Sequence, residues 1–325
     1  MRALICRRWG SIDELELGDM PVPQPAADEV LIRVKATAVN YADSIMVAGR
    51  YQTKPALPFS PGLETAGNIE ACGSDVRGFA KGDRVMAILA YGGLAEYAVA
   101  PAVETFRIPD GMGWVEAGAF PVAYISSHVA IRWQGRLEAG ETMLVLGAAG
   151  GVGLTAVEIG KAMGARVIAA ASTPEKLAVA VEHGADDTIN YTQEKLTERV
   201  MALTGGNGVD VCFDPVGGDL FDAALSSLAW GGRILLVGFV GGIPQIPANR
   251  LLVKHRAALG SSLRYFRWHA PDKLKRSVDE LLQWFSEGKL KPCITHRLPL
   301  EKSVEALRLL TERQAYGKIV VELQP

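Results

Sequence analysis

The sequence predicts an α/β protein in which a β-rich domain accompanies a doubly wound parallel sheet. Up to about Pro121 the chain is rich in glycine and proline and contains short strand-like segments. From Ile125 onward, apolar strands alternate with helix-period segments, which is typical of a parallel sheet covered by helices. An apolar run at 142–146 also enters a glycine-rich turn and leaves into a helix. The 325 residues suffice for two such domains.

The first region is predicted to contain mainly strands. Apolar and polar residues alternate over residues 29–34, 82–87 and 95–99, and glycine and proline lie between these segments. A short helical segment is expected at 44–47. Short strands separated by turn residues indicate a twisted β-rich domain.

The second region is predicted to form the doubly wound sheet. Strands are expected at 142–146, 166–171, 209–214, 233–237 and 257–262, with helices at 154–163 and 220–228. Helix-period segments at 271–285 and 300–310 and a strand at 318–323 then complete the chain, and we assign this last part to the β-rich domain. The predicted domains are residues 1–122 with 264–325, and residues 123–263.

The glycine-rich turn indicates a phosphate-binding loop. Without a Cβ at Gly150 and Gly151 the backbone can approach a pyrophosphate, and Gly153 lets the following helix pack on the strand. The dinucleotide fingerprint has glycine where this chain has Ala148, so the pattern departs from Gly-x-Gly-x-x-Gly. The flanking strands and helix nevertheless favour a dinucleotide site.

The end of the second strand of this region favours NADPH over NADH. NAD sites place Asp or Glu roughly 20 residues after the last glycine, where it bonds the ribose 2′-hydroxyl. This chain has Ser172 and Thr173 there, followed by Lys176. Hydroxyl donors and a cation suit a 2′-phosphate, which a carboxylate would repel. The alternative for Lys176 is a solvated cation on the first turn of a helix.

Composition excludes several classes of function. Lys plus Arg total 34 and Asp plus Glu total 36, so the net charge of −2 gives no electrostatic footprint for nucleic acid. No segment approaches the ~20 apolar residues of a membrane span, and the first residues lack the apolar core of a secretion signal. We therefore expect a cytoplasmic protein that binds neither nucleic acid nor membrane.

The whole chain resembles the medium-chain dehydrogenase/reductase superfamily, in its zinc-independent quinone oxidoreductase (zeta-crystallin-like) branch. The resemblance rests on six segments that run from end to end, namely residues 39–43, 61–67, 78–85, 148–153, 232–234 and 316–320. It implies a GroES-like catalytic domain built from both termini, an inserted Rossmann domain, and a cleft between them.

The same resemblance allows a test for metal. Related alcohol dehydrogenases hold a catalytic zinc through Cys and His, and zinc usually takes three such protein ligands. Here Asn40 stands at the first cysteine position, and Leu63 replaces the histidine of a Gly-His-Glu triplet. No cysteine occurs from Arg84 to Ala102, where a structural zinc lobe would lie. No zinc is expected, and Glu64 is expected to remain as a polar floor of the cleft.

Asn40, Asp43 and Tyr51 are the candidate catalytic residues that the resemblance implies. A metal-free reduction relies on orientation, a hydride from the nicotinamide and hydrogen-bond donors to the acceptor. The Tyr51 phenol supplies both an aromatic wall and a donor. Three alternatives stay open: Tyr51 packs at an interface, Asn40 braces a turn, and Asp43 caps the helical segment at 44–47.

The resemblance also places cofactor contacts along the second region. Ser126 is expected near the nicotinamide ribose, Tyr191 over the adenosine phosphate, and later contacts at the ends of strands. Lys318 is a weaker candidate for a phosphate contact. The full set of expected cofactor contacts is Ser126, Ala149, Gly150, Gly151, Val152, Gly153, Ser172, Thr173, Lys176, Tyr191, Val216, Gly217, Gly238, Phe239, Val240, Ser261, Ser262, Leu263 and Lys318.

The expected function is NADPH-dependent reduction of a quinone or a related conjugated carbonyl compound. One alternative is an enoyl-thioester or enone double-bond reductase in which Tyr51 donates the proton. Another is a non-catalytic NADPH-binding protein. The family often pairs Rossmann domains near residues 257–262, so a homodimer or homotetramer is expected. The aromatic and basic segment 264–269 belongs to a substrate pocket or to a subunit interface.

Overall fold

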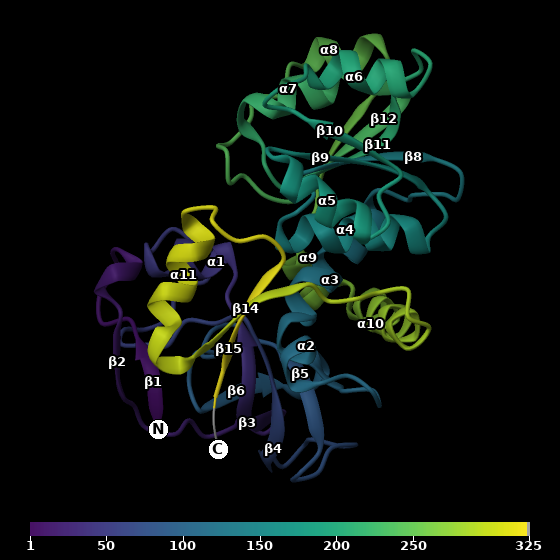
Figure 1. Ribbon diagram of the computed structural model, residues 1–325. Helices are drawn as coiled ribbons and strands as arrows, with labels where there is room; N and C mark the ends of the chain where they lie inside the picture. The colour runs from purple at the N-terminus through teal and green to yellow at the C-terminus, as the bar shows by residue number, and fades with distance from the viewer. Residues whose placement is uncertain (324–325) are drawn as a thin grey trace. The chain divides into compact units, whose positions relative to one another are not determined.

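The computed structural model describes residues 1–323, which form two compact units (Figure 1). The terminal unit consists of Met1–Val122 and the chain from Pro292 onward, and the central unit consists of Ala123–Lys291. The terminal unit is mainly β-structure, and the central unit alternates strands and helices. The mixed α/β architecture with an inserted parallel sheet is therefore confirmed.

A seven-stranded sheet forms the frame of the terminal unit. Its order is β14-β15-β3-β4-β5-β7, with β6 paired to β3, and only β14 and β15 run parallel. A separate antiparallel pair joins β1 and β2. The strands are β1 (Arg2–Ile5), β2 (Glu16–Asp19), β3 (Glu29–Ala38), β4 (Glu64–Cys72), β5 (Arg84–Ile88), β6 (Tyr97–Pro101), β7 (Thr105–Arg107), β14 (Ile294–Pro299) and β15 (Lys318–Glu322).

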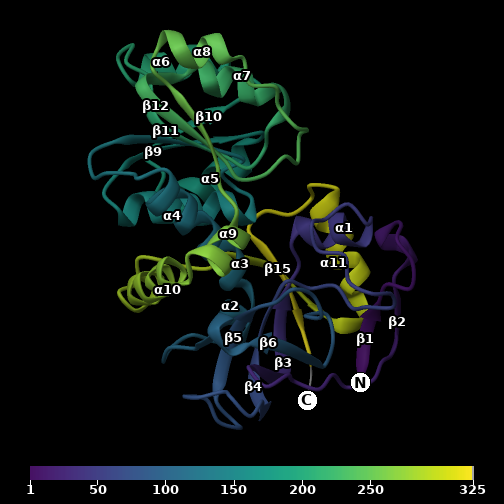
Figure 2. The same ribbon diagram turned by 180° about the vertical axis from the view of Figure 1, so that it is seen from behind.

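Buried apolar side chains recur at alternate positions along β3, so that one face of the sheet packs against the core of the terminal unit. Val30, Ile32 and Val34 are buried, whereas Arg33 between them is exposed. Helix α11 packs beside α1 over the same unit, as both views show (Figures 1 and 2). The helices of this unit are α1 (Tyr41–Val47), α2 (Trp114–Ala119) and α11 (Ser303–Thr311), with 3-10 turns at Ile12–Glu14, Ala102–Glu104 and Leu300–Lys302.

A six-stranded parallel sheet forms the centre of the second unit. Its order is β10-β9-β8-β11-β12-β13, so the direction of winding reverses between β8 and β11. Sheets of this kind bind ligands outside the carboxyl ends of the strands at that reversal. The strands are β8 (Thr142–Leu146), β9 (Arg166–Ala171), β10 (Asp187–Asn190), β11 (Val209–Asp214), β12 (Leu228–Leu236) and β13 (Ala257–Gly260).

Helices cover both faces of the parallel sheet. Figure 1 shows α4 and α5 on one face and α6 and α7 on the other. The apolar runs of β8 and β9 are buried almost throughout, because both faces of these strands are covered. The helices are α3 (Pro121–His128), α4 (Gly151–Ala162), α5 (Pro174–Glu182), α6 (Leu196–Leu203), α7 (Gly218–Ser226), α8 (Ala248–Val253), α9 (Leu263–His269) and α10 (Pro271–Ser286), with a π-helix at Val129–Gln134.

Residues 264–291 differ from the predicted division of the chain. They were expected in the β-rich domain, but α9 and α10 group with the central unit. Helix α10 buries Leu274 and Leu281, and Ser277 Oγ accepts a hydrogen bond of 2.8 Å from the Trp133 indole. The apolar pattern of an amphipathic helix predicts that one face is buried, but it does not predict which domain covers that face.

No helix among residues 1–323 combines the length and the apolar character that a bilayer span requires.

Candidate functional site

The glycine-rich turn joins β8 to α4 at the reversal of the sheet. Gly147 has a φ of +57°, which side chains of L-residues rarely adopt, and its carbonyl accepts the Gly150 N–H at 2.9 Å. A Cβ on Gly153 would lie 2.1 Å from the Gly147 oxygen. The turn therefore requires glycine at both positions and leads directly into the N-terminus of α4, the end of a helix that suits a phosphate.

The structure explains why Ala148 is compatible with this turn. Ala148 is buried, and its N–H donates to the Ala170 carbonyl at 3.1 Å. The left-handed conformation lies one residue earlier, at Gly147, so position 148 accepts a methyl group. Ala149 is buried as well, whereas Gly150 and Gly151 retain exposure at the start of α4, as does Val152.

The residues expected near a 2′-phosphate follow β9. Thr173 is the N-cap of α5, and its hydroxyl accepts the Lys176 N–H at 3.3 Å. Ser172 is partly exposed, and its carbonyl accepts the Thr192 hydroxyl at 3.1 Å. Lys176 lies in the first turn of α5. This position fits both a contact to the 2′-phosphate and the alternative of a solvated cation. The three residues share one strand end, and the carboxyl of Glu175 lies between Thr173 and Lys176, where hydrogen bonds from its own N–H and from the Thr173 side chain lower its pKa.

Two further loops lie at the carboxyl ends of β11 and β12. Val216 and Gly217 follow β11, while Gly238, Phe239 and Val240 follow β12. The Gly241 N–H donates to the Val216 carbonyl at 2.7 Å, so the loops are bonded to each other. The structure thus brings these five expected contacts to the sheet edge that carries the glycine turn.

The other expected contacts of the central unit are distributed over three elements. Ser126 on α3 is partly exposed, but its neighbour Ser127 is buried, and the Ser127 hydroxyl lies 2.7 Å from that of Thr155. Tyr191 follows β10 and is partly exposed. Ser261, Ser262 and Leu263 follow β13, where Ser262 is the N-cap of α9.

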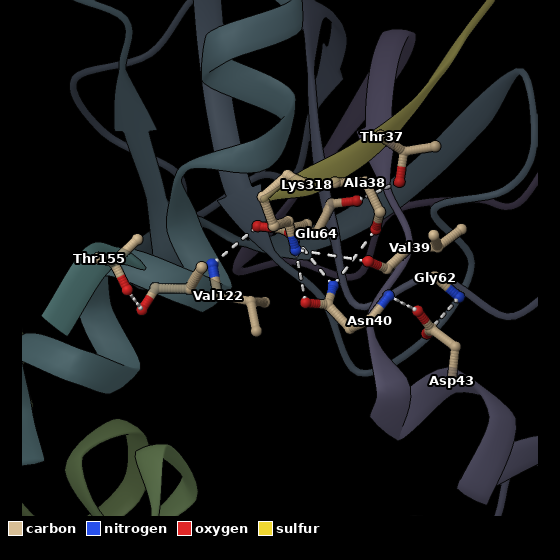
Figure 3. Close-up of polar contacts among 11 residues, drawn as sticks. Thr37, Ala38, Val39, Asn40, Asp43, Gly62, Glu64, Val122, Thr155 and Lys318 are labelled. Carbon is tan, nitrogen blue, oxygen red and sulfur yellow. Dashed lines mark hydrogen bonds and ion pairs between the residues drawn. The ribbon is translucent and has the colours of Figure 1, made fainter. Parts of the chain in front are cut away.

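Asn40, Glu64 and Lys318 form a polar cluster in the terminal unit (Figure 3). Lys318 Nζ lies 2.9 Å from Glu64 Oε1 and 2.7 Å from Asn40 Oδ1. Strand β15 pairs with the end of β3, and β4 pairs with β3 on its other side, so three distant parts of the chain meet here. The Glu64 side chain is fully buried, and that of Lys318 is 8% exposed.

All three side chains of this cluster have protein partners. The Asn40 amide donates to Glu64 Oε1 at 2.9 Å and to the Ala38 carbonyl at 3.3 Å. Lys318 Nζ also donates to the Val39 carbonyl at 3.4 Å. Glu64 Oε2 accepts the Val122 N–H at 2.8 Å. A role for Asn40 as donor to an acceptor molecule, or for Lys318 on a phosphate, would therefore require these bonds to break.

Asp43 braces the loop beside this cluster. Its Oδ2 accepts the Asn40 N–H at 2.7 Å, and its Oδ1 accepts the Gly62 N–H at 3.1 Å (Figure 3). The side chain is fully buried, and burial raises the pKa of Asp43 to about 7 against the opposing effect of the two amides and Lys318. Asp43 is the third residue of α1 and bonds back to the N-cap residue Asn40, whereas the alternative interpretation placed it before the helix, as the cap of residues 44–47.

Tyr51 is the remaining catalytic candidate. It follows α1, is partly exposed and packs against the core of the terminal unit. Of the three candidates, Tyr51 alone has a hydroxyl group on a partly exposed side chain, since Asp43 is fully buried. Tyr51 therefore differs from Asn40 and Asp43, which brace the loop.

Zinc does not fit the side chains at the polar cluster. The Lys318 ammonium already neutralises Glu64, and the Asn40 amide is bonded on both sides. Within residues 1–323 no group of three or more His, Cys, Asp and Glu side chains is arranged to hold a metal ion. The cluster thus presents an ion pair and a bonded amide in place of the thiolate and imidazole ligands that zinc prefers.

Comparison with known families agrees with both units. The family model described as the alcohol dehydrogenase GroES-like domain matches residues 26–110. The model described as zinc-binding dehydrogenase matches residues 151–286. The matched segments fall in the terminal and the central unit respectively.

Individual relatives extend the likeness over the whole chain. The quinone oxidoreductase-like protein 2 homolog of Nematostella vectensis is 38% identical over 98% of this chain and 88% of its own length. Quinone oxidoreductase-like protein 2 of Bos taurus is 37% identical over 93% and 87%. The structure of Escherichia coli quinone oxidoreductase complexed with NADPH has a TM-score of 0.93 at 27% identity, covering 99% of this chain and 100% of that one. The chain belongs to the quinone oxidoreductase family of the medium-chain dehydrogenase/reductase superfamily.

Proposed function

We propose that this protein is an NADPH-dependent oxidoreductase that reduces quinones or related conjugated carbonyl compounds without a metal. The observation that carries the proposal is the turn at Gly147–Gly153, which lies at the reversal of the parallel sheet and requires glycine for its shape. Two similar solved structures, the Escherichia coli quinone oxidoreductase and a mycobacterial protein, are complexed with NADPH.

The central unit supplies the groups that would hold NADPH. The N-terminus of α4 suits the pyrophosphate, and the side chains of Ser172, Thr173 and Lys176 suit the 2′-phosphate. The other expected contacts, Ser126, Tyr191 and the residues after β11, β12 and β13, would line the remainder of the cofactor. When bound, NADPH supplies the hydride.

The terminal unit supplies the polar groups for the acceptor. We assign Tyr51 the role of hydrogen-bond or proton donor to an acceptor oxygen. Asn40 and Asp43 are proposed as positioning residues, because their bonds fix the segment between β3 and α1. Lys318 is proposed to neutralise Glu64 rather than to contact a phosphate.

A double-bond reductase is the second candidate function. One observation favours it: the Tyr51 hydroxyl is a proton donor on a partly exposed side chain, whereas the Asp43 carboxyl is fully buried and braces the loop. Reduction of an enone or enoyl thioester requires such a proton after hydride addition. Quinone reduction depends less on a proton donor from the protein, because a quinol oxygen also exchanges protons with water.

The test is the rate of NADPH oxidation with a quinone series and, in parallel, with enone and enoyl-thioester series. Fast turnover of quinones alone supports the proposed function, whereas a preference for activated alkenes makes the protein a double-bond reductase. NADPH binding without turnover of any series establishes the non-catalytic alternative. NADH and a chelator serve as controls: NADH is expected to be the poorer donor, and the chelator is expected to leave activity unchanged.

We also propose that two copies associate through the β13 edge of the parallel sheet. Within the described residues β13 pairs only with β12, so its other edge has unpaired backbone groups. The paired strand β12 and the preceding helix α8 carry exposed apolar side chains: Trp230 on β12 is 72% exposed, and Leu252 and Val253 on α8 are 82% and 66% exposed. The aromatic helix α9, with Tyr265 and Trp268 each 55% exposed, follows the same strand.

Light scattering after size-exclusion chromatography tests the association. Leu252→Glu is expected to lower the molecular mass from a dimer or tetramer toward a monomer. Val103→Glu is the matched control, because Val103 is 78% exposed in the terminal unit. An unchanged mass for Leu252→Glu would contradict the proposed interface.

A further inference from the structure

Asp214 is a fully buried carboxylic acid at the end of β11, the first strand beyond the reversal of the parallel sheet. Its Oδ1 accepts the N–H groups of Val216 and Gly217, each at 2.8 Å. Its backbone carbonyl accepts the Val237 N–H at 2.9 Å. One residue thus binds the loop after its own strand and the loop after the neighbouring strand β12.

The two loops fit together with little clearance. The Gly218 N–H donates to the Gly242 carbonyl at 2.9 Å, and the Gly241 N–H donates to the Val216 carbonyl at 2.7 Å. Gly217 has a φ of +66°, and a Cβ there would lie 2.4 Å from the Gly242 oxygen. The peptide units of residues 215–218 therefore have to keep one arrangement for the loops to interlock.

The same loop lies against the phosphate-binding turn. The Cβ position of Gly147, the glycine with left-handed conformation, is 3.0 Å from Val216 Cγ2. A displacement of Val216 would therefore press on the turn, or leave it unsupported. The side chain of Asp214 is the group that holds the Val216 and Gly217 amides in place.

The second carboxyl oxygen of Asp214, Oδ2, makes no hydrogen bond within the described residues. Oδ2 is buried and has no hydrogen-bond partner there, which is costly for an ionised oxygen. Burial raises the pKa of Asp214 above its ordinary value, opposed by the Gly217 and Val216 amides. Asparagine has nearly the same shape as aspartate and keeps one oxygen that can accept the two amides.

We propose that Asp214 is a positioning residue for NADPH, which fixes the interlocked loops 215–218 and 237–242 at the carboxyl ends of β11 and β12 in the arrangement that receives the cofactor. The inference rests on the proposed function. It concerns a side chain that touches no cofactor itself and acts through the backbone of Val216 and Gly217.

The test compares NADPH dissociation constants of Asp214→Asn, Asp214→Ala and a matched control, Asp219→Ala, whose exposed carboxyl lies on α7. Asp214→Ala leaves the Val216 and Gly217 amides without their acceptor and is expected to weaken NADPH binding by about tenfold or more. Asp214→Asn is expected to restore binding to within about twofold, and the KM for the quinone is expected to stay unchanged in all three.

A second variant covers the case in which Asp214→Ala does not fold. Gly217→Ala keeps the carboxyl but forces the interlocked loops apart, and it is expected to raise the NADPH dissociation constant in the same way. Wild-type affinity in Asp214→Ala, or in Gly217→Ala should the first not fold, would overturn the inference. An Asp214→Asn variant as weak as Asp214→Ala would also overturn it. If the wild-type protein itself fails to bind NADPH, the proposed function fails instead.

Discussion

Lys318 and Glu64 form a buried ion pair of 2.9 Å although 254 positions separate them in the sequence. Strand β15 brings Lys318 to the end of β3, because Val320 pairs with Ala38. The first residue of β4, Glu64, lies on the other side of β3. Removing one charge of such a pair leaves the other buried and uncompensated.

Lys318→Met should therefore lower the free energy of unfolding by about 3–5 kcal/mol in urea denaturation. Adding Glu64→Gln should recover most of this loss, because the buried charge is then removed. Lys302→Met, which disrupts the exposed pair with Glu305, should change the free energy of unfolding by less than about 1 kcal/mol. A loss of equal size in the Lys302 and Lys318 variants would contradict the assigned pairing.

The pH dependence of the free energy of unfolding should reveal the protonation of the Asp43 carboxyl. Its pKa in the folded protein is about 7, above the value of about 3.9 in an unfolded chain, because the carboxyl is buried. Between these values the folded state binds more proton than the unfolded state, so the free energy of unfolding falls as pH rises from about 4 to about 7. Urea denaturation across this range should show a shallower fall for Asp43→Asn. Asp110→Asn, an exposed control, should follow the wild type.

Ser172→Asp should shift the cofactor preference from NADPH toward NADH. The new carboxylate would repel a 2′-phosphate and accept a bond from a 2′-hydroxyl. We expect the ratio of kcat/KM for the two cofactors to change by roughly tenfold or more. Ser286→Asp adds the same charge to an exposed site on α10 and should leave the ratio unaltered. If Ser172→Asp gave no change, the phosphate would have to bind elsewhere.

Tyr51→Phe should reduce kcat by on the order of 100-fold while the NADPH dissociation constant stays near the wild-type value. The reason is that the hydroxyl acts on the acceptor and not on the cofactor. Tyr97→Phe removes a hydroxyl from a partly exposed tyrosine on β6 and serves as the control. Stopped-flow reduction of the best acceptor separates the two constants, and unchanged kinetics would reduce Tyr51 to a packing residue.

Gly150→Ala and Gly153→Ala should separate binding from stability. A Cβ at position 153 would lie 2.1 Å from the Gly147 oxygen, so this variant should melt at a lower temperature with or without NADPH. At position 150 the nearest atom, the Gly147 oxygen, would be 3.3 Å away, so the apo protein should lose less thermal stability than the Gly153 variant does. The methyl group would still obstruct the pyrophosphate, and the rise in melting temperature on adding NADPH should be lost. Equal behaviour of the two variants would contradict the assigned roles.

The sequence by itself determined three adjacent strands of the central sheet and its glycine-rich turn. Strands β8, β9 and β11 have the predicted bounds, because each is an apolar run buried by neighbours on both faces. Strands β10 and β14 were not predicted, since both are short and at least half of their residues are polar or partly exposed. The pattern of apolar residues along the chain predicts a strand best where the strand is completely buried.

Only the tertiary structure decided which side chains meet. Lys318 was a weaker candidate for a phosphate contact, and the structure pairs it with Glu64. Asn40 was a candidate for the acceptor or for bracing a turn, and it bonds to both Glu64 and Lys318. Helix α10 was expected in the β-rich domain and packs in the central unit. Such partners depend on the order of strands in a sheet and on which apolar face covers which, and no spacing along the chain encodes either.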